Sequence, residues 1–510
     1  MTVKDTKRSR KTGQACVPAI AEALEDRRLL ASGLGWGVGW GYPNVFSSAN
    51  YSVTDPNGNT YVAGIFRGPV NVATKGEPPT YINSINSKDD IFVAKYRSDG
   101  ALLWAHRFGG PNYETVTALI LGPGGALYMT GTYQNYISFS IGQPKTTLVS
   151  RGQSDGFIVR MTQTTGVPTW SGSIGGQYDD SITGVAVDSA GRLYIAGWVR
   201  ISGNLAPVGK AVNITTRGTD DTFIERIDPA SGHLLWYKVF GENNTAETVL
   251  KMAADPAGGI IASGQFNATV QFDRSSQKFT RTSVGGWDIY IADLSPDGKF
   301  RYVRQFGGQH DDGLSDMIVA ANGDLYFTGL IDKDIVVSTN PAKTVYLNAD
   351  YNTSIYITRM RKDGSIVWAG EIGGDGTPSA TALALDASGN LYVGGAFTAN
   401  TDFDPGPGTK YIDVNKDKPG VVPNQFDATD AYLLKLSPAG KFVAVDHFGG
   451  PDGSVVINDL GLDSAGNAYL VGQFVRNINI VPPPGKPYML IGTARDDTSN
   501  VLVMKLLTGA

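Results

Sequence analysis

A twelve-residue pattern that recurs seven times constrains the fold of this 510-residue chain more than any other feature. Each copy has a Gly-containing turn followed by an apolar stretch with a glycine near its end, as in residues 55–66. Turn residues between apolar runs predict a strand, a tight turn and a second strand. The recurring glycine lies at intervals of 65 to 67 residues, with one of 77, at Gly64, Gly131, Gly197, Gly264, Gly329, Gly395 and Gly472.

A second block follows six of these copies and supplies two more strands around another turn. It covers residues 90–110, 155–176, 221–241, 288–308, 354–374 and 430–450. Four short strands per period form the unit of a β-propeller blade. We therefore expect an all-β fold, a single seven-bladed β-propeller with four-stranded antiparallel blades.

The seventh copy lacks an outer strand, because the chain offers only one strand after Asn500. The missing strand is indicated near the other end of the sequence. Trp36 precedes Gly64 by 28 residues, and four other tryptophans precede their glycines by 27 or 28. We expect residues 35–41 to join the last blade and close the ring, which would remove its open edge.

The sequence thus divides into a leader, residues 1–32, and a propeller, residues 33–510. The expected blades span about 44–110, 111–176, 177–242, 243–308, 309–374, 375–450, and 451–510 together with 33–43.

The composition excludes several classes of protein. No run approaches 18 apolar residues, so no transmembrane span is expected. A net charge of −5 gives no footprint for nucleic acid. The only cysteine, Cys16, lies in the leader, so the propeller has neither disulfides nor thiol nucleophiles.

Two segments resemble known families. Residues 24–32 (LEDRRLLAS) resemble the LEPR-XLL motif of exported bacterial proteins, with Asp26 where that motif has Pro. The repeats resemble the SBBP family of seven-bladed β-propeller repeats in bacterial exported proteins, through the pattern DxxGNxYVxG, DxFVxKL, GxLxW and FGG. These resemblances imply an extracellular or cell-envelope location, and they imply no common activity. A short amphipathic helix is the alternative interpretation of residues 24–32.

The variable loops between the second and third strands are expected on one face, where binding usually occurs. They span residues 67–90, 133–155, 200–221, 267–288, 332–354, 398–430 and 475–500. The longest contains Asp402 and Asp404, which we consider candidate binding residues.

Four acidic residues stand 17 positions before the recurring glycine in blades two to five: Glu114, Asp180, Glu247 and Asp312. Pro378, Val455 and Ser47 take this position elsewhere. The favoured interpretation is that each acid caps backbone N–H groups in its own loop. The alternative is a cation site near the axis, because carboxylate oxygens suit Ca²⁺.

Three further polar residues lie beside this position, namely Asp179, Asp311 and His310. His310 next to two acids is a candidate metal ligand or oriented imidazole. The outer-strand tryptophans are expected to pack between blades rather than to form a substrate platform.

No catalytic motif stands out, and we expect no enzyme and no cofactor, with Ca²⁺ as the alternative. The sequence favours an exported monomeric binding or scaffold module whose partner is a protein or a surface glycan. The alternative function is a quinoprotein-like or polysaccharide-processing propeller enzyme. It is suggested by residues 228–236, which resemble the tryptophan repeats of quinone-dependent propellers.

Overall fold

The computed structural model describes most of residues 33–508. The gaps are residues 43–44, 75, 87, 142–145, 244, 338–344, 349–353, 415–428, 451–452, 481–488 and 491–497. The leader, with Cys16 and the LEPR-XLL-like stretch, lies outside the described residues. So do parts of the candidate loops 67–90, 133–155, 332–354, 398–430 and 475–500.

The first repeat shows how the sequence pattern builds its four strands. Strands β2 (Ser48–Thr54), β3 (Thr60–Phe66), β6 (Asp90–Tyr96) and β7 (Leu102–Phe108) pair antiparallel in that order. In the β2–β3 turn, the Asp55 carboxylate accepts the N–H groups of Asn57 and Asn59 at 2.9 and 3.0 Å. The predicted turn chemistry is confirmed here, with Gly58 at a φ of 78°.

Every other sequence repeat also contributes four strands. The second contains β8 (Glu114–Gly122), β9 (Ala126–Ser138), β10 (Thr147–Thr162) and β11 (Pro168–Gly176). The third contains β12 (Ser181–Val187), β13 (Leu193–Asn204), β14 (Asn213–Ile227) and β15 (Leu234–Phe240). The fourth contains β16 (Glu247–Ala254), β17 (Ile260–Phe266), β20 (Asp288–Leu294) and β21 (Phe300–Phe306).

The remaining repeats follow the same order. The fifth contains β22 (Asp316–Val319), β23 (Leu325–Ile331), β26 (Ser354–Met360) and β27 (Ile366–Gly374). The sixth contains β28 (Ser379–Leu385), β29 (Leu391–Phe397), β32 (Asp430–Leu436) and β33 (Phe442–Phe448). The last combines β34 (Ser454–Leu462), β35 (Ala468–Val475) and β38 (Ser499–Leu507) with β1 (Gly33–Trp40).

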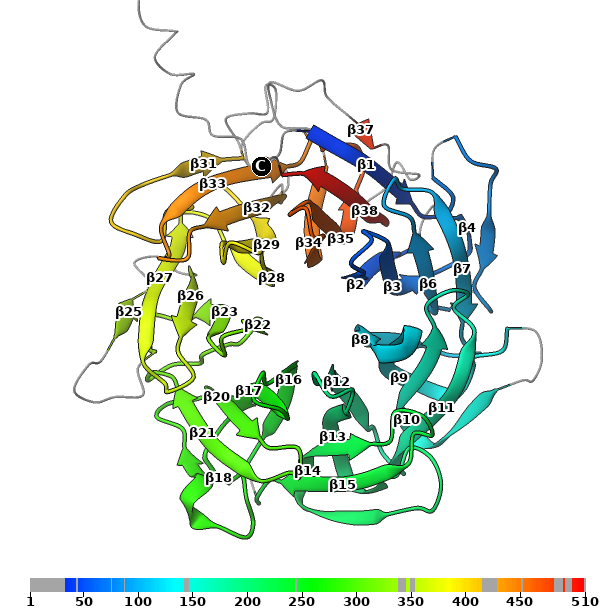
Figure 1. Ribbon diagram of the computed structural model, residues 1–510, viewed down its shortest axis with the longest axis vertical. Coiled ribbons are helices and arrows are strands. Elements are labelled where there is room, and N and C mark those ends of the chain that lie inside the picture. Colours follow the sequence, from blue (N-terminus) through cyan, green and yellow to red (C-terminus); the bar gives the residue numbers. More distant parts are fainter. Residues whose placement is uncertain are drawn as a thin grey trace, which may run out of the picture.

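The first strand of each repeat lies innermost, around a central opening (Figure 1). Neighbouring inner strands contact one another around the whole ring, in the order β2, β8, β12, β16, β22, β28, β34 and back to β2. The predicted closure is confirmed, because β1 pairs antiparallel with β38 from Gly33–Leu507 to Trp40–Val501. Figure 1 shows this as the blue strand beside the red one.

The predicted division into seven separate four-stranded blades is wrong. Backbone hydrogen bonds join the described strands into six sheets of four or more strands: four of four strands, one of six and one of eight. The larger sheets form because β13 pairs with β11, and β30 (Asn400–Asp402) pairs with β27, each across a repeat boundary. In these two places, backbone N–H and C=O groups at the edge of an outer strand are paired with another strand instead of being left open.

The connections between second and third strands are therefore not simple loops. Each forms or extends a hairpin, and we call these the extension hairpins: residues 69–83, 136–149, 202–215, 269–282, 334–348, 400–413 and 478–490. Two of them continue β9–β10 and β13–β14. The others are β4 (Pro69–Asn71) with β5 (Tyr81–Asn83), β18 (Thr269–Gln271) with β19 (Thr280–Thr282), β24 (Asp334–Val336) with β25 (Tyr346–Asn348), β30 with β31 (Tyr411–Asp413), and β36 (Ile478–Asn479) with β37 (Met489–Leu490).

Among the described residues, helical structure is limited to two 3₁₀ turns, η1 (Pro123–Gly125) and η2 (Gln277–Phe279). In the same part of the chain, no helix has the length and apolar character needed to cross a bilayer.

The outer-strand tryptophans join consecutive repeats, as predicted. Trp104 in β7 donates its indole N–H to the carbonyl of Gln163, in a turn of the next repeat, at 3.3 Å. Trp36 in β1 makes the equivalent bond to Ser98 at 3.1 Å and so links the last repeat to the first. The same bond recurs for Trp170, Trp236 and Trp368, with the carbonyls of Pro229, Pro296 and Pro438.

Candidate functional site

The four candidate acids lie where one repeat meets the next. The backbone N–H of Asp180 donates to the carbonyl of Ser154 in the preceding repeat at 2.8 Å. Ser47, at the equivalent position in the first repeat, donates its N–H to Ser499 at 3.2 Å. The position 17 residues before the recurring glycine therefore joins neighbouring repeats through the backbone, and this bond does not require an acidic side chain.

Each candidate acid also faces the aspartate that begins the second sequence block of the preceding repeat. Gly175 shows how close this packing is, because a Cβ there would lie 2.6 Å from the Asp155 carboxyl and 3.0 Å from Asp180 Oδ2. The pairs are Asp90 with Glu114, Asp155 with Asp180, Asp221 with Glu247 and Asp288 with Asp312. The sequence contained both members of each pair, but we did not predict that they would meet.

Burial makes these acids unusually weak. Burial, with a smaller contribution from the nearby Asp90, raises the pKa of Glu114 to about 9. Burial likewise raises the pKa of Glu247 to about 8, and of Asp180 and Asp312 to about 7. Glu114 and Glu247 are thus neutral in the folded protein at pH 7, and a neutral carboxyl is a poor ligand for a cation.

Backbone and side-chain donors hold three of the four acids. Asp180 accepts the N–H groups of Gly176 and Arg200 at 2.6 and 2.8 Å. Asp312 accepts the N–H of Gly308 at 2.6 Å, and Glu247 accepts the hydroxyl of Thr245 at 2.9 Å. The Glu114 carboxyl is buried too, and a backbone hydrogen bond from Gly110 partly opposes the rise in its pKa.

Among the other predicted site residues, Asp179, Asp311 and His310 contact neighbouring segments, whereas Asp402 and Asp404 bond within their own loop. Asp179 accepts the N–H and hydroxyl of Ser154, and Asp311 accepts the N–H of Trp287 at 2.9 Å. His310 Nδ1 lies 3.1 Å from Asp334 Oδ1. Asp402 accepts the N–H groups of Asp404 and Lys410, and Asp404 accepts that of Gly406. Across the described ranges, no three His, Cys, Asp or Glu side chains are grouped closely enough to hold a metal. The Ca²⁺ site stays a prediction.

Sequence reasoning missed a charged cluster on the inner strands. Lys251 Nζ lies 3.1 Å from Asp316 Oδ1. Burial would lower the pKa of Lys251, but the nearby Asp316, Tyr51 and Asp459 outweigh it and the pKa is raised. All four residues stand 13 positions before the recurring glycine, so the repeat register could have revealed them. Small residues fill this register elsewhere: Ala118, Gly184 and Ala382.

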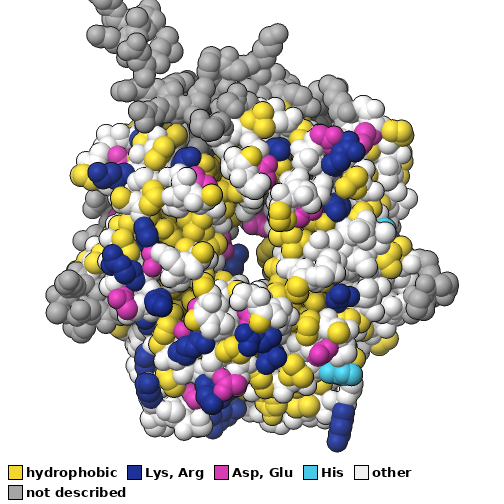
Figure 2. All heavy atoms as spheres, in the orientation of Figure 1, with side chains coloured by type: hydrophobic (Ala, Val, Ile, Leu, Met, Phe, Trp, Pro, Cys, Tyr) yellow, Lys and Arg dark blue, Asp and Glu magenta, His cyan; other side chains and the backbone are white. Residues whose placement is uncertain are grey.

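One residue earlier, hydroxyl and amide side chains link neighbouring inner strands. Thr183 Oγ1 donates to the carbonyl of Val249 in the next repeat at 2.6 Å. Equivalent bonds run from Thr117 to Ile182, from Thr381 to Ile457 and from Asn458 to Ala49. Figure 2 shows the ring hollowed at its centre, with acidic, basic and hydrophobic side chains interspersed over the face in view.

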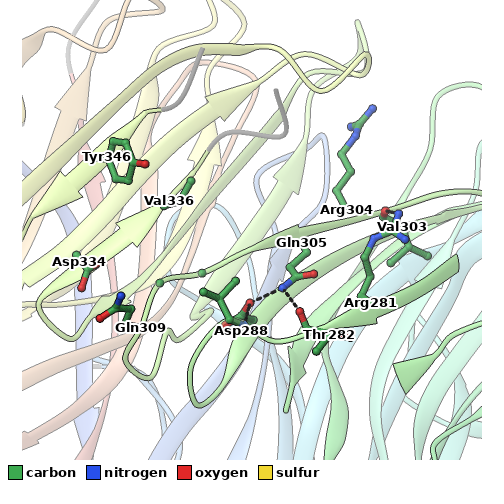
Figure 3. A pocket seen from close by; sticks show the side chains of 13 residues that line it. Arg281, Thr282, Asp288, Val303, Arg304, Gln305, Gln309, Asp334, Val336 and Tyr346 are labelled. Carbon is green, nitrogen blue, oxygen red and sulfur yellow. Dashed lines mark hydrogen bonds between the residues drawn. The ribbon is translucent and has the colours of Figure 1, made fainter. Parts of the chain in front are cut away.

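A cavity of about 770 Å³ lies outside this ring, between the fourth and fifth repeats. It is open to solvent and is bordered by strands β19, β21, β24 and β25 (Figure 3). Its polar lining includes Arg281, Asp288, Arg304, Gln305, Gln309 and Asp334. Tyr346 and three valines, Val284, Val303 and Val336, add apolar surface.

A closed ring of antiparallel sheets with their first strands around a central opening defines a β-propeller, and this chain is a repeat protein of that class. No model of a known protein family matches the chain, so the SBBP resemblance stays a prediction.

Among curated proteins, the chain is 25% identical over 244 residues to an uncharacterized WD repeat-containing protein of Acanthamoeba polyphaga mimivirus. That match covers 41% of this chain and 17% of the relative. The chain is 22% identical over 400 residues to the regulatory protein FlaEY of Caulobacter vibrioides, covering 72% of this chain and 33% of that protein. The chain therefore spans a third or less of either relative.

Among solved structures, similar chains include the quinohemoprotein alcohol dehydrogenase from Comamonas testosteroni, with 11% identity and a TM-score of 0.41. The match covers 94% of this chain and 77% of that one. The Dos1 propeller is 8% identical with a TM-score of 0.38, covering 94% and 96% of the two chains. Similarity this low carries no functional argument.

Proposed function

We propose that this chain is an exported, non-enzymatic binding module that recognises a partner protein through its extension hairpins. The observation that carries the proposal is an exposed tyrosine at the same place in three hairpins. Tyr81, Tyr346 and Tyr411 each begin the second hairpin strand, and they are 65%, 63% and 48% exposed. Tyrosine is enriched at protein interfaces, because it offers a large contact area and a hydroxyl with little loss of rotamer freedom.

The hairpins present these tyrosines on a fixed base. In each case the middle residue of the first hairpin strand is buried, namely Val70, Ile335 and Thr401. The second strand lies outside it and is paired to it residue by residue. A surface held in this way loses little conformational entropy on binding, which favours affinity.

Two sequence features support export: the LEPR-XLL-like stretch and the resemblance of the repeats to SBBP proteins. We place the protein outside the cell or in its envelope on that basis. Fractionation of source cells tests this location directly, and recovery of the chain only from the cytosol would contradict it.

Cross-linking in source cells, followed by mass spectrometry, tests the binding surface. A triple variant, Tyr81→Ser, Tyr346→Ser and Tyr411→Ser, should lose the cross-linked partner that the wild-type chain retains. The matched control replaces three exposed apolar residues of outer strands, Leu103→Ser, Leu235→Ser and Tyr237→Ser, and should keep it. Equal recovery by both variants would refute the hairpin surface, and a glycan as the retained partner would refute the partner class.

A further inference from the structure

A buried ion pair recurs on the third strand in three successive repeats. The aspartate that begins the second sequence block of the repeat, on β6, β10 or β14, is fully buried. One of its oxygens, Oδ2, receives an arginine guanidinium. The pairs are Arg107 with Asp90 at 2.8 Å, Arg151 with Asp155 at 3.0 Å and Arg274 with Asp221 at 2.5 Å.

The three arginines come from different parts of the chain. Arg107 lies on the outer strand of its own repeat, Arg151 on the extended β10, and Arg274 just after β18 of the next repeat. Their side chains are 31%, 38% and 27% exposed. An arginine side chain can therefore extend from the surface to this buried aspartate oxygen from at least three different places in the chain.

The fourth repeat breaks this pattern. Asp288 begins β20 and is fully buried, but Gln305 stands where the first repeat has Arg107. The Gln305 amide donates to Asp288 Oδ2 at 2.6 Å and to the carbonyl of Thr282 at 2.7 Å (Figure 3). Within the described residues, no arginine or lysine forms an ion pair with Asp288, whose Oδ2 also accepts the backbone N–H of Val284 at 3.1 Å. A buried carboxylate without a cation is costly, so this position favours a positive group.

The cavity of about 770 Å³ opens beside Asp288, and the two arginines in its wall are already engaged. Arg281 donates to the carbonyls of Val303 and Thr280. Arg304 stacks on Tyr302, 3.7 Å from the ring centroid, and donates to the carbonyl of Lys362 at 2.6 Å. Tyr302 replaces the outer-strand tryptophan here, so Arg304 supplies the bond between repeats that an indole makes elsewhere.

We propose that this cavity binds an arginine side chain presented by a partner protein, whose guanidinium displaces the Gln305 amide from Asp288 and pairs with it as Arg107, Arg151 and Arg274 pair with the equivalent aspartates. The inference rests on the proposed function, because Tyr346 of the hairpin surface also lines the cavity. Asp334 and Gln309, which line the cavity on one side of Asp288, offer further oxygen acceptors (Figure 3). A guanidinium suits the site better than an ammonium, because its planar fork can bond several acceptors at once.

Fluorescence polarisation with labelled pentapeptides tests the site on the full chain. The probe is Gly-Ser-Arg-Ser-Gly, and its control carries citrulline, a neutral isostere, in place of the arginine. We expect the wild-type protein to bind the arginine peptide at least tenfold more tightly than the citrulline peptide. Equal binding of the two peptides would overturn the proposal.

The decisive variant is Gln305→Arg, which rebuilds the internal ion pair of the first repeat. It should fold at least as well as the wild type and abolish the preference for the arginine peptide. Asp288→Asn should abolish the preference as well. Tyr237→Arg, which adds the same charge at an exposed position on β15, should preserve it. Retention of the preference in Gln305→Arg would refute the site.

The two proposals fail in distinguishable ways. If the tyrosine variant loses its partner while wild type shows no peptide preference, only the arginine site is wrong. If peptide preference behaves as predicted but cross-linked partners ignore the tyrosines, only the hairpin surface is wrong.

Discussion

The replacement of Glu114 by glutamine should stabilise the protein, and by an amount that depends on pH. Glu114 is 1% exposed, and desolvation of its carboxyl outweighs the backbone hydrogen bond from Gly110. Burial raises its pKa from 4.5 to about 9, with a further contribution from Asp90. The folded protein therefore binds a proton at this site that the unfolded chain releases above pH 4.5.

The sign and size of the effect follow from linkage. Because the folded state holds more protons between pH 4.5 and 9, its stability falls as the pH rises through that window. At pH 7 the penalty is about 3 kcal/mol, since each pKa unit is worth about 1.4 kcal/mol and pH 7 lies about 2.5 units above the unfolded pKa. At pH 5 it is below about 1 kcal/mol by the same arithmetic. Glutamine does not ionise in either state, so Glu114→Gln removes the cost of binding a proton on folding.

Urea unfolding followed by tryptophan fluorescence at pH 5, 7 and 8.5 measures this difference. The gain from Glu114→Gln should grow from pH 5 to 7 and again to 8.5. Glu242→Gln is the matched control, because that side chain is 29% exposed and pairs with Arg217 at the surface. The control should change stability by less than about 1 kcal/mol. A gain that is equal at all three pH values, or a loss at pH 7, would refute a neutral buried carboxyl.

Three further substitutions test other parts of the ring by the same assay. Thr183→Val removes the hydroxyl that donates to the Val249 carbonyl at 2.6 Å, and should cost about 1 to 3 kcal/mol because that buried acceptor loses its partner. Gly131→Ala should prevent folding or cost more than about 3 kcal/mol, because its Cβ would lie 1.9 Å from a backbone oxygen. The matched Gly124→Ala meets no atom within 4 Å and should cost only about 1 kcal/mol, from its φ of 66°. Glu225→Leu should stabilise the protein by about 1 to 3 kcal/mol, since both carboxyl oxygens are buried without partners.

Each of these predictions has an outcome that contradicts it. An unchanged midpoint for Thr183→Val would mean that the bond between inner strands contributes nothing. Equal losses for the two glycine variants would point to backbone conformation rather than steric contact. A loss for Glu225→Leu would show that the carboxyl interacts favourably in the folded state.

Much of the fold could be predicted from the sequence, because the repeat carries side-chain signals. The turn at Asp55 and Gly58, the four strands per repeat and the offset of Trp36 are all properties of residue type and spacing. The structure confirms the turn, the strands, the ring closure and the tryptophan contacts between repeats.

The sheets could not be counted in the same way. The pairing of β13 with β11 occurs at Gly175 and Gly176, and that of β30 with β27 at Gly373 and Gly374. Strands are predicted from alternating polar and apolar side chains, which glycine lacks. The hydrogen bonds at these glycines join backbone atoms only. Which sheets merge is therefore decided by the geometry of the extension hairpins rather than by a sequence pattern.

The candidate site was only partly visible for a related reason. Glu114 and Asp90 belong to different repeats and different strand positions, so a comparison of repeats aligned them separately. Their contact depends on the angle between neighbouring repeats. The arginine-free Asp288 was hidden too, because the arginines of the other repeats come from three different positions.

The pairing of β1 with β38 has a consequence for how the chain reaches its folded state. Ser47 and Ser499 are hydrogen-bonded although they lie 452 residues apart. A ribosome makes β1 first and β38 last, so the first-made strand waits without its partner while every other repeat is synthesised. During that time its unpaired edge can pair with other chains. The final pairing also carries a large entropic cost, because it joins the two ends of a very long chain segment. We therefore expect the β1–β38 pairing to form last during folding and to open first when a mechanical force pulls on the two ends of the chain.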